Sequence, residues 1–312
     1  MSAPLAPPGP GDVHVWQVRL NLEGDDLQAL TAVLSADERE RARRFVRACD
    51  ASRSAAARGH LRWLLGRYLR FPAAEVRLGA GPHGKPYVSA PGAGWLRFNM
   101  SHSSDRALIA VANGRDVGVD IERIQPELAD PGLAKLFAPA EQRALSGLPA
   151  DDYIDQCFTV WTRKEAVLKG LGVGLSVPLD GVDVLDDRVR FTADLVRDLP
   201  AASTSTWNVR SLEQGEEYSA AVAVQTPSVF TSADHLVHSR SQANDLGVEP
   251  DRPVSEAVRV VPLTGSAPER RSRMGAEWRG GTPRARSGAK CPFLKAGLAA
   301  RPSSGRSTKL KA

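Results

Sequence analysis

Residues 116–124 read DVGVDIERI, a segment in which apolar and polar side chains alternate. Such alternation predicts a β-strand with one face in a core, so Val119 and Ile121 point inward while Asp120 and Glu122 share the other side. Two carboxylates this close repel each other, and the arrangement is favourable mainly when a cation lies between them. The segment therefore predicts either a Mg²⁺ site or a solvated acidic strand end.

A strong helical pattern follows this strand over residues 155–171. Within WTRKEAVLKG at 161–170, Trp161, Glu165 and Lys169 are four residues apart and share one helix face. A carboxylate one turn before an ammonium can bind metal while the lysine meets a phosphate, but an ordinary helix salt bridge has the same spacing. A further helix is expected over 133–146, and strands are expected over 181–186, 188–193, 205–212 and 218–225.

The residues before 116 repeat the same kinds of element. We expect a strand over 13–20, a helix that starts at the capping-box pair Ser35 and Glu38, and a second helix over 51–69. Short strands bounded by Gly and Pro are expected over 76–79, 85–88, 95–101 and 106–112. Each half pairs helices with antiparallel strands, which predicts an α+β fold with two similar lobes, one over 1–112 and one over 113–225.

Charge and composition separate a C-terminal tail from the rest of the chain. The 312 residues carry a net charge of +5, with 42% hydrophobic and 25% charged residues, as in an ordinary soluble globular protein. Residues 226–312 hold 15 Lys and Arg against 7 Asp and Glu, whereas residues 1–225 hold 26 against 29. This basic tail is rich in Ser, Arg, Pro and Gly, and we expect it to be disordered except for a short strand at 258–263.

The sequence also indicates a location. No apolar run approaches the ~18 residues of a membrane span, and the first residues have no basic region followed by an apolar core. Three cysteines lie far apart without metal-ligand spacing, which predicts neither a disulfide framework nor a zinc site: Cys49, Cys157 and Cys291. We therefore expect a cytoplasmic protein without a membrane partner.

Three further polar segments could carry chemistry. FNMSHS at 98–103 puts Ser101 and His102 at a strand end, where exposed N–H groups suit anions, although a lone His is more often structural. Lys85 lies on a turn in Gly84-Lys85-Pro86. Arginine forks suit phosphate, or form a solvated basic face, and several arginines follow the helix start at Ser35, among them Arg39, Arg41, Arg43, Arg44 and Arg53.

The order of these motifs is more specific than any one of them. GKP, FNMSHS, GVDIE and WTRKEAVLKG, in that sequence, resemble the 4′-phosphopantetheinyl transferases of the larger, surfactin-synthetase-activating type. The resemblance covers about residues 13–225. It implies a monomeric pseudo-dimer of two similar lobes, with the active site in the cleft between them. It also implies Mg²⁺-dependent transfer of 4′-phosphopantetheine from coenzyme A to a serine of an apo acyl or peptidyl carrier protein, with release of 3′,5′-ADP.

The resemblance further implies roles for single residues. Three acids match the metal ligands: Asp120, Glu122 and Glu165. Seven residues match coenzyme A contacts: Arg41, Arg53, Lys85, Ser101, His102, Asp120 and Lys169. Either Glu165 or a water that it holds on the metal would remove the proton of the acceptor serine, while Lys169 would neutralise or protonate the leaving group. Fatty-acid, polyketide and nonribosomal-peptide carriers all remain open.

Two departures from the family pattern stand out. Some relatives carry a cation one turn before Arg41, where this chain has Glu38, and the tail has no counterpart. Two other functions compete with transfer: nucleic-acid binding through the basic tail, and a silent relative that binds coenzyme A without catalysis. The tail lacks interleaved aromatic residues and any recognised module, and the acid set is complete. We therefore expect a catalytic enzyme without a nucleic-acid partner.

Overall fold

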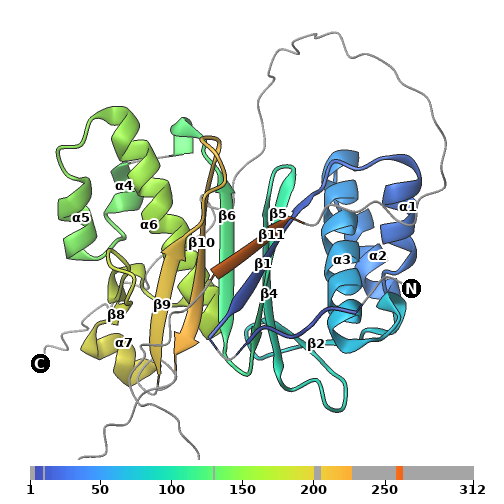
Figure 1. Cartoon of the computed structure of the whole chain (residues 1–312). Coiled ribbons are helices and arrows are strands. Elements are labelled where there is room, and N and C mark those ends of the chain that lie inside the picture. The colour runs from blue at the N-terminus through green and yellow to red at the C-terminus, as the bar shows by residue number, and fades with distance from the viewer. Residues whose placement is uncertain (1–3, 10, 129–130, 200–204, 227–257, 263–312) are drawn as a thin grey trace, which may run out of the picture.

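Two β-sheets face each other at the centre of the molecule, and helices cover their outer faces (Figure 1). The computed structural model describes residues 4–9, 11–128, 131–199, 205–226 and 258–262. The first sheet has the strand order β11-β1-β5-β4 and the second the order β6-β10-β9. All pairings in these two sheets are antiparallel except that of β11 with β1. This combination of helices with mostly antiparallel strands confirms the α+β fold class.

Apart from β11, the first sheet and its helices come from the N-terminal part of the chain, together with a separate two-stranded sheet formed by β2 and β3. Their elements are β1 (Val13–Arg19), α1 (Gly24–Ala32), α2 (Ala36–Arg43), α3 (Ala48–Leu69), β2 (Leu78–Ala80), β3 (Pro86–Val88), β4 (Leu96–Ser103) and β5 (Arg106–Asn113). The predicted capping box starts α2, because the Glu38 N–H donates to Ser35 Oγ at 3.2 Å and the Ser35 N–H donates to Glu38 Oε2 at 3.0 Å. The sequence did not predict α1, although two acids in its first turn favour a helix start there.

The second sheet and its helices follow, together with a separate two-stranded sheet formed by β7 and β8. Their elements are β6 (Val117–Arg123), α4 (Pro131–Ala134), α5 (Pro139–Leu145), α6 (Ala150–Leu171), β7 (Val182–Asp183), β8 (Arg190–Phe191), α7 (Ala193–Asp198), β9 (Thr206–Ser211) and β10 (Tyr218–Thr226). The single helix expected over 133–146 is wrong, because Pro139 starts a new helix instead of continuing the previous one. The strand expected over 188–193 is also too long, since Thr192 caps α7.

Buried apolar residues fill three layers between these elements. Strand β5 is buried on both faces: Leu108 and Ala110 pack against the second sheet, while Ile109 and Val111 pack against α3. On β6, Val119 and Ile121 belong to the cluster between the sheets, as the alternation predicts. The other face of β6 packs against α6, so Asp120 and Glu122 are directed to that side.

The basic tail is described only in part. Residues 227–257 and 263–312 lie outside the described residues, so the expected disorder there stays a prediction. Val258–Pro262 form strand β11 alongside β1, which confirms the short strand expected at 258–263. Within the described part of the chain, no helix is long and apolar enough to cross a membrane.

Candidate active site

Strand β4 connects the two sheets through alternate side chains. Asn99 Oδ1 accepts a hydrogen bond from the Val119 N–H at 3.0 Å, and Ser101 Oγ donates to Asp120 Oδ1 at 2.8 Å. Ser103 Oγ donates to Glu122 Oε2 at 2.8 Å. Because residues 99, 101 and 103 share one face of β4, each meets its counterpart on β6. The FNMSHS segment therefore fixes both the backbone and the acids of β6.

Two glycines allow helix α6 to approach the second sheet closely, Gly118 on β6 and Gly170 opposite Trp207 of β9. A Cβ on Gly118 would lie 1.9 Å from the Ala166 carbonyl oxygen, and one on Gly170 would lie 2.4 Å from the Trp207 ring. No larger residue fits at either position without movement of the helix. This close packing brings the Glu165–Lys169 face of α6 against the acids of β6.

Asp120 is the centre of the site. It is 1% exposed, and its Oδ1 lies 2.5 Å from Lys169 Nζ, which also donates to Ser101 Oγ at 2.9 Å. Burial alone would lower the pKa of Lys169, but the charges of Asp120 and Glu165 outweigh it and raise the pKa. Lys169 therefore stays a cation at neutral pH and can neutralise a negatively charged group of a ligand.

The other two predicted acids face the same centre. Burial, followed by the negative charge of Asp120, raises the pKa of Glu122 to about 8. The same two causes raise the pKa of Glu165 to about 7, although Lys169 opposes them. A carboxyl group with a pKa near neutrality can accept a proton under physiological conditions.

The carboxylates retain unused acceptor atoms. Within the described residues, Asp120 Oδ2 and Glu165 Oε1 are buried and have no hydrogen-bond partner. Buried carboxylate oxygens without a partner are costly, and a cation would relieve them. Among these same residues, however, no group of three or more His, Cys, Asp or Glu side chains could hold a metal ion by itself. Any metal here would need ligands from another source.

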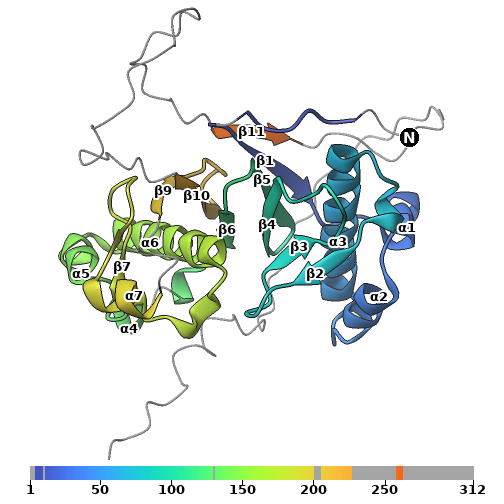
Figure 2. The same ribbon diagram turned by 90° about the horizontal axis from the view of Figure 1, so that it is seen from below.

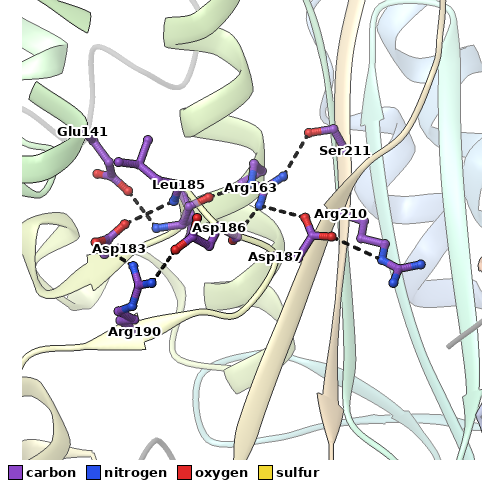
Figure 3. A network of polar contacts seen from close by, with 10 residues as sticks. Glu141, Arg163, Asp183, Leu185, Asp186, Asp187, Arg190, Arg210 and Ser211 are labelled. Atoms are coloured by element: carbon purple, nitrogen blue, oxygen red, sulfur yellow. Dashed lines mark hydrogen bonds and ion pairs between the residues drawn. The ribbon is translucent and has the colours of Figure 1, made fainter. Parts of the chain in front are cut away.

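A polar network holds α6 from its other side (Figure 3). Arg163 Nε donates to the Val184 carbonyl oxygen and its Nη2 to that of Asp186, both at 2.7 Å. Lys164 Nζ lies 2.6 Å from Glu141 Oε2, and both side chains are 0% exposed. These neighbours of Glu165 fix the rotation of α6, so Glu165 and Lys169 keep facing β6.

A basic pocket lies beside His102, between α2, α3 and β4. Its volume is about 410 Å³, and α2, α3 and β4 line it with these residues: Glu38, Arg41, Arg44, Phe45, Ser54, Ala57, Arg58, Met100 and His102. The structure thus brings Arg41 and His102 to the same pocket, and their contact with a cofactor stays a prediction. Arg53 is not among the lining residues, because its guanidinium bonds Asn21 at 2.8 Å and lies 3.9 Å from Asp50.

Lys85 lies in a different pocket, where the β2–β3 hairpin approaches the end of α6 (Figure 2). Its Nζ donates to the Gly170 carbonyl oxygen at 2.5 Å and to Asp116 Oδ1 at 3.3 Å. Lys85 therefore connects the two parts of the chain and is not adjacent to Arg41. Sequence reasoning missed Asn99 and Ser103, which bond to β6, and Arg58, which lines the basic pocket.

This arrangement suits a ligand that carries more than one phosphate, because buried acids, a lysine and a basic pocket adjoin in one α+β protein. The family model described as 4′-phosphopantetheinyl transferase superfamily matches residues 116–223. The model described as 4′-phosphopantetheinyl transferase, N-terminal, matches residues 21–114.

Individual relatives agree with these matches. The 4′-phosphopantetheinyl transferase HetI of Nostoc sp. is 34% identical over 215 residues, which cover 68% of this chain and 87% of that protein. The 4′-phosphopantetheinyl transferase Sfp of Bacillus subtilis is 27% identical over 207 residues, which cover 66% and 88%. The solved "ACPS-CoA complex" of Chronobacterium ammoniagenes is 21% identical and covers 36% of this chain and 97% of that one, but its TM-score of 0.31 adds no argument. The chain belongs to the 4′-phosphopantetheinyl transferase family, whose enzymes place phosphopantetheine on carrier proteins.

Proposed function

We propose that this chain transfers the 4′-phosphopantetheine group of coenzyme A to a serine of an apo acyl or peptidyl carrier protein and releases 3′,5′-ADP. One observation carries the proposal beyond family membership. Asp120, Glu165 and Lys169 converge where β4, β6 and α6 meet, beside a basic pocket. Phosphoryl-type transfer depends on alignment and charge neutralisation more than on covalent chemistry, and this cluster offers both.

The donor set fits a Mg²⁺ ion. The oxygens of Asp120 and Glu165 that lack a partner within the described residues are hard ligands, and burial, followed by the negative charge of Asp120, raises the pKa of Glu122 beside them. Protein Mg²⁺ sites commonly use one or two carboxylates and take further ligands from phosphates and water. Asp120 and Glu165 would hold the ion, with Glu122 at a bound water or directly. When bound, Mg²⁺ supplies charge stabilisation to the diphosphate of coenzyme A.

Three residues of the chain would have distinct roles in the transfer. Lys169 stays protonated and would neutralise the charge that develops on the departing 3′,5′-ADP. Glu165 would accept the proton of the acceptor serine, directly or through water. Ser101 holds Asp120 and Lys169 in register by donating to one and accepting from the other.

Coenzyme A would lie between the two parts of the chain, each formed by one sheet and its helices. We propose an N-terminal lobe over 1–112, a C-terminal lobe over 113–225 and a cleft between them that holds the cofactor. His102 and Arg41 would contact its nucleotide, with Lys85 at the hairpin, whereas Arg53 bonds Asn21 and lies near Asp50 instead. The monomeric state and the cytoplasmic location stay predictions.

A mass measurement tests the proposal directly. The full chain is incubated with Mg²⁺, coenzyme A and a panel of apo carrier proteins, and each carrier is weighed. We expect a gain of one phosphopantetheine group on at least one carrier, and no gain in any of them would contradict the function. Asp120→Ala and Glu165→Ala should abolish transfer, and normal turnover of Asp120→Ala would refute its assignment.

A further inference from the structure

Side chains of the second sheet hold the turn that joins β4 to β5 in the first sheet. The turn consists of Ser104, which has a left-handed φ of 54°, and Asp105. The Tyr218 hydroxyl of β10 donates to Asp105 Oδ1, and the Arg106 guanidinium lies 4.2 Å from the centre of the Tyr218 ring. Arg106 Nη1 also donates to the Gln214 carbonyl oxygen at 2.6 Å. These contacts connect the end of the β4–β5 hairpin to the start of β10, at one end of the two sheets (Figure 1).

The bond between Tyr218 and Asp105 joins a hydroxyl to a charged carboxylate. Tyr218 is 4% exposed, and burial, followed by the hydrogen bond to Asp105, raises its pKa, so the hydroxyl stays protonated. Burial also raises the pKa of Asp105, but the hydrogen bonds from Tyr218 and from its own N–H, together with the charges of Arg106 and Arg53, outweigh burial and lower that pKa. A hydrogen bond to an ionised group is roughly twice as strong as a neutral one. The turn is therefore firmly attached to β10.

The same turn lies next to the side chain that orients Glu122. Ser103 immediately precedes the turn and pairs with Arg106 across the hairpin. Ser103 Oγ donates to Glu122 Oε2 at 2.8 Å and accepts the Arg123 N–H at 3.1 Å. Because Ser103 and Asp105 are two residues apart in a tight hairpin, a shift of the turn moves Ser103 with it.

Loss of the Tyr218 bond would loosen the turn without unfolding it. The ladder between β4 and β5 holds the turn within the first sheet, and the Leu20 N–H donates to the Asp105 carbonyl oxygen at 2.8 Å. Both of these attachments use backbone atoms and remain when the Tyr218 hydroxyl is removed. The hydroxyl instead fixes the turn relative to the second sheet, which carries Glu122.

We propose that Tyr218 is a positioning residue for the transfer reaction: through Asp105 it fixes the β4–β5 turn, so that Ser103 keeps the Glu122 carboxylate beside Asp120. The proposal rests on the proposed function, because it assumes that Mg²⁺ binds at these acids. Removing a partner that orients a metal ligand commonly lowers metal affinity by roughly 10- to 100-fold. Tyr218 acts through further residues, so its removal should have a smaller effect on Mg²⁺ affinity.

Thermal unfolding of the full chain tests this without relying on turnover. Mg²⁺ is titrated at saturating coenzyme A, and its apparent Kd is taken from the rise in Tm. We expect Tyr218→Phe, which keeps the ring beside Arg106, to raise this Kd by about 3- to 10-fold. Asp105→Ala should have the same effect, whereas Asp105→Asn keeps the acceptor oxygen and should restore most of the affinity. The matched control is Tyr153→Phe, which removes a hydroxyl from α6 at the apolar cluster around Cys157 and should leave the Kd unchanged.

The outcomes separate positioning from a structural role and from failure of the proposed function. A lower Tm with an unchanged Kd of Mg²⁺ in Tyr218→Phe would mean that the bond is only structural, and would overturn the inference. An Asp105→Asn variant as weak as Asp105→Ala would exclude the hydrogen bond as the cause. A wild type that shows no Mg²⁺-dependent rise in Tm and modifies no carrier would contradict the proposed function, and this inference with it. If Tyr218→Phe does not fold, the comparison of the two Asp105 variants still decides.

Discussion

Replacing Gly118 by Ala should disrupt the active site without touching any polar residue. The added Cβ would lie 1.9 Å from the Ala166 carbonyl oxygen and 2.4 Å from the Gly170 nitrogen, both backbone atoms of α6. Ordinary contact begins near 3.4 Å, so α6 must move away from β6 by about 1–1.5 Å. Overpacking of this kind costs about 1–3 kcal/mol, and the upper end applies because backbone atoms cannot rotate aside.

Two assays measure the expected loss of stability and the expected loss of activity. A loss of about 3 kcal/mol should lower the Tm by roughly 6–12 °C in a domain of this size. A displacement of about 1 Å between Asp120 and the Glu165–Lys169 face should lower kcat/KM by roughly 100-fold at temperatures where the variant is folded.

Gly94→Ala provides the control, because a Cβ added there would have no atom of the described residues within 4 Å and the φ of Gly94 is not left-handed. A Gly118→Ala variant with the Tm and turnover of Gly94→Ala would refute the claim that close α6–β6 packing sets the site.

Three further changes test the scaffold. Lys164→Met leaves buried Glu141 without its cation, although the Ala138 and Val184 N–H groups still donate to it, so urea titration should show a loss of about 3–5 kcal/mol. Adding Glu141→Gln should recover part of this loss, and full additivity would contradict a coupled pair. Burial lowers the pKa of His60 to about 4 in the folded protein. Between pH 6.5 and pH 4, His60 is therefore protonated in the unfolded chain but neutral in the folded one. Stability contributed by neutral His60 should therefore fall from pH 6.5 to 4, by up to about 3 kcal/mol relative to His60→Gln, and a pH-independent difference would sink the idea. Ser35→Ala removes the cap of α2 and should cost about 1 kcal/mol in thermal unfolding; no change would mean that the Glu38–Arg62 pair alone holds the helix start.

Local patterns in the sequence were sufficient for the strand that carries the acids. Alternation predicted that Val119 and Ile121 are buried and that Asp120 and Glu122 face the other way, because side-chain direction on a strand depends only on position. The capping box of α2 was predictable for the same reason. Pro139 also marks a helix start, because proline is tolerated in the first turn of a helix and disrupts its interior.

Contacts between distant segments could not be predicted in this way. Asn99 and Ser103 bond to β6, and nothing in FNMSHS indicates which strand lies opposite. Applying the alternation to β4 itself would have grouped both with Ser101. Residues 53 and 58 of α3 are about 140° apart around the helix, so only one of their arginines can face a given pocket. The sequence cannot decide between them until the rotation of α3 against β4 is known.

The fold also explains why repelling acids stay together. Turning β6 to separate Asp120 from Glu165 would carry Val119 and Ile121 out of the core between the sheets, at about 1.5–3 kcal/mol for each side chain. Asn99 fixes the backbone at Val119, and the missing side chain at Gly118 lets α6 pack directly against β6. The strand therefore cannot relax its charges by moving, and Lys169 compensates only part of them. The remaining negative charge is therefore held in place by the apolar core, and a cation bound where β4, β6 and α6 meet would compensate it.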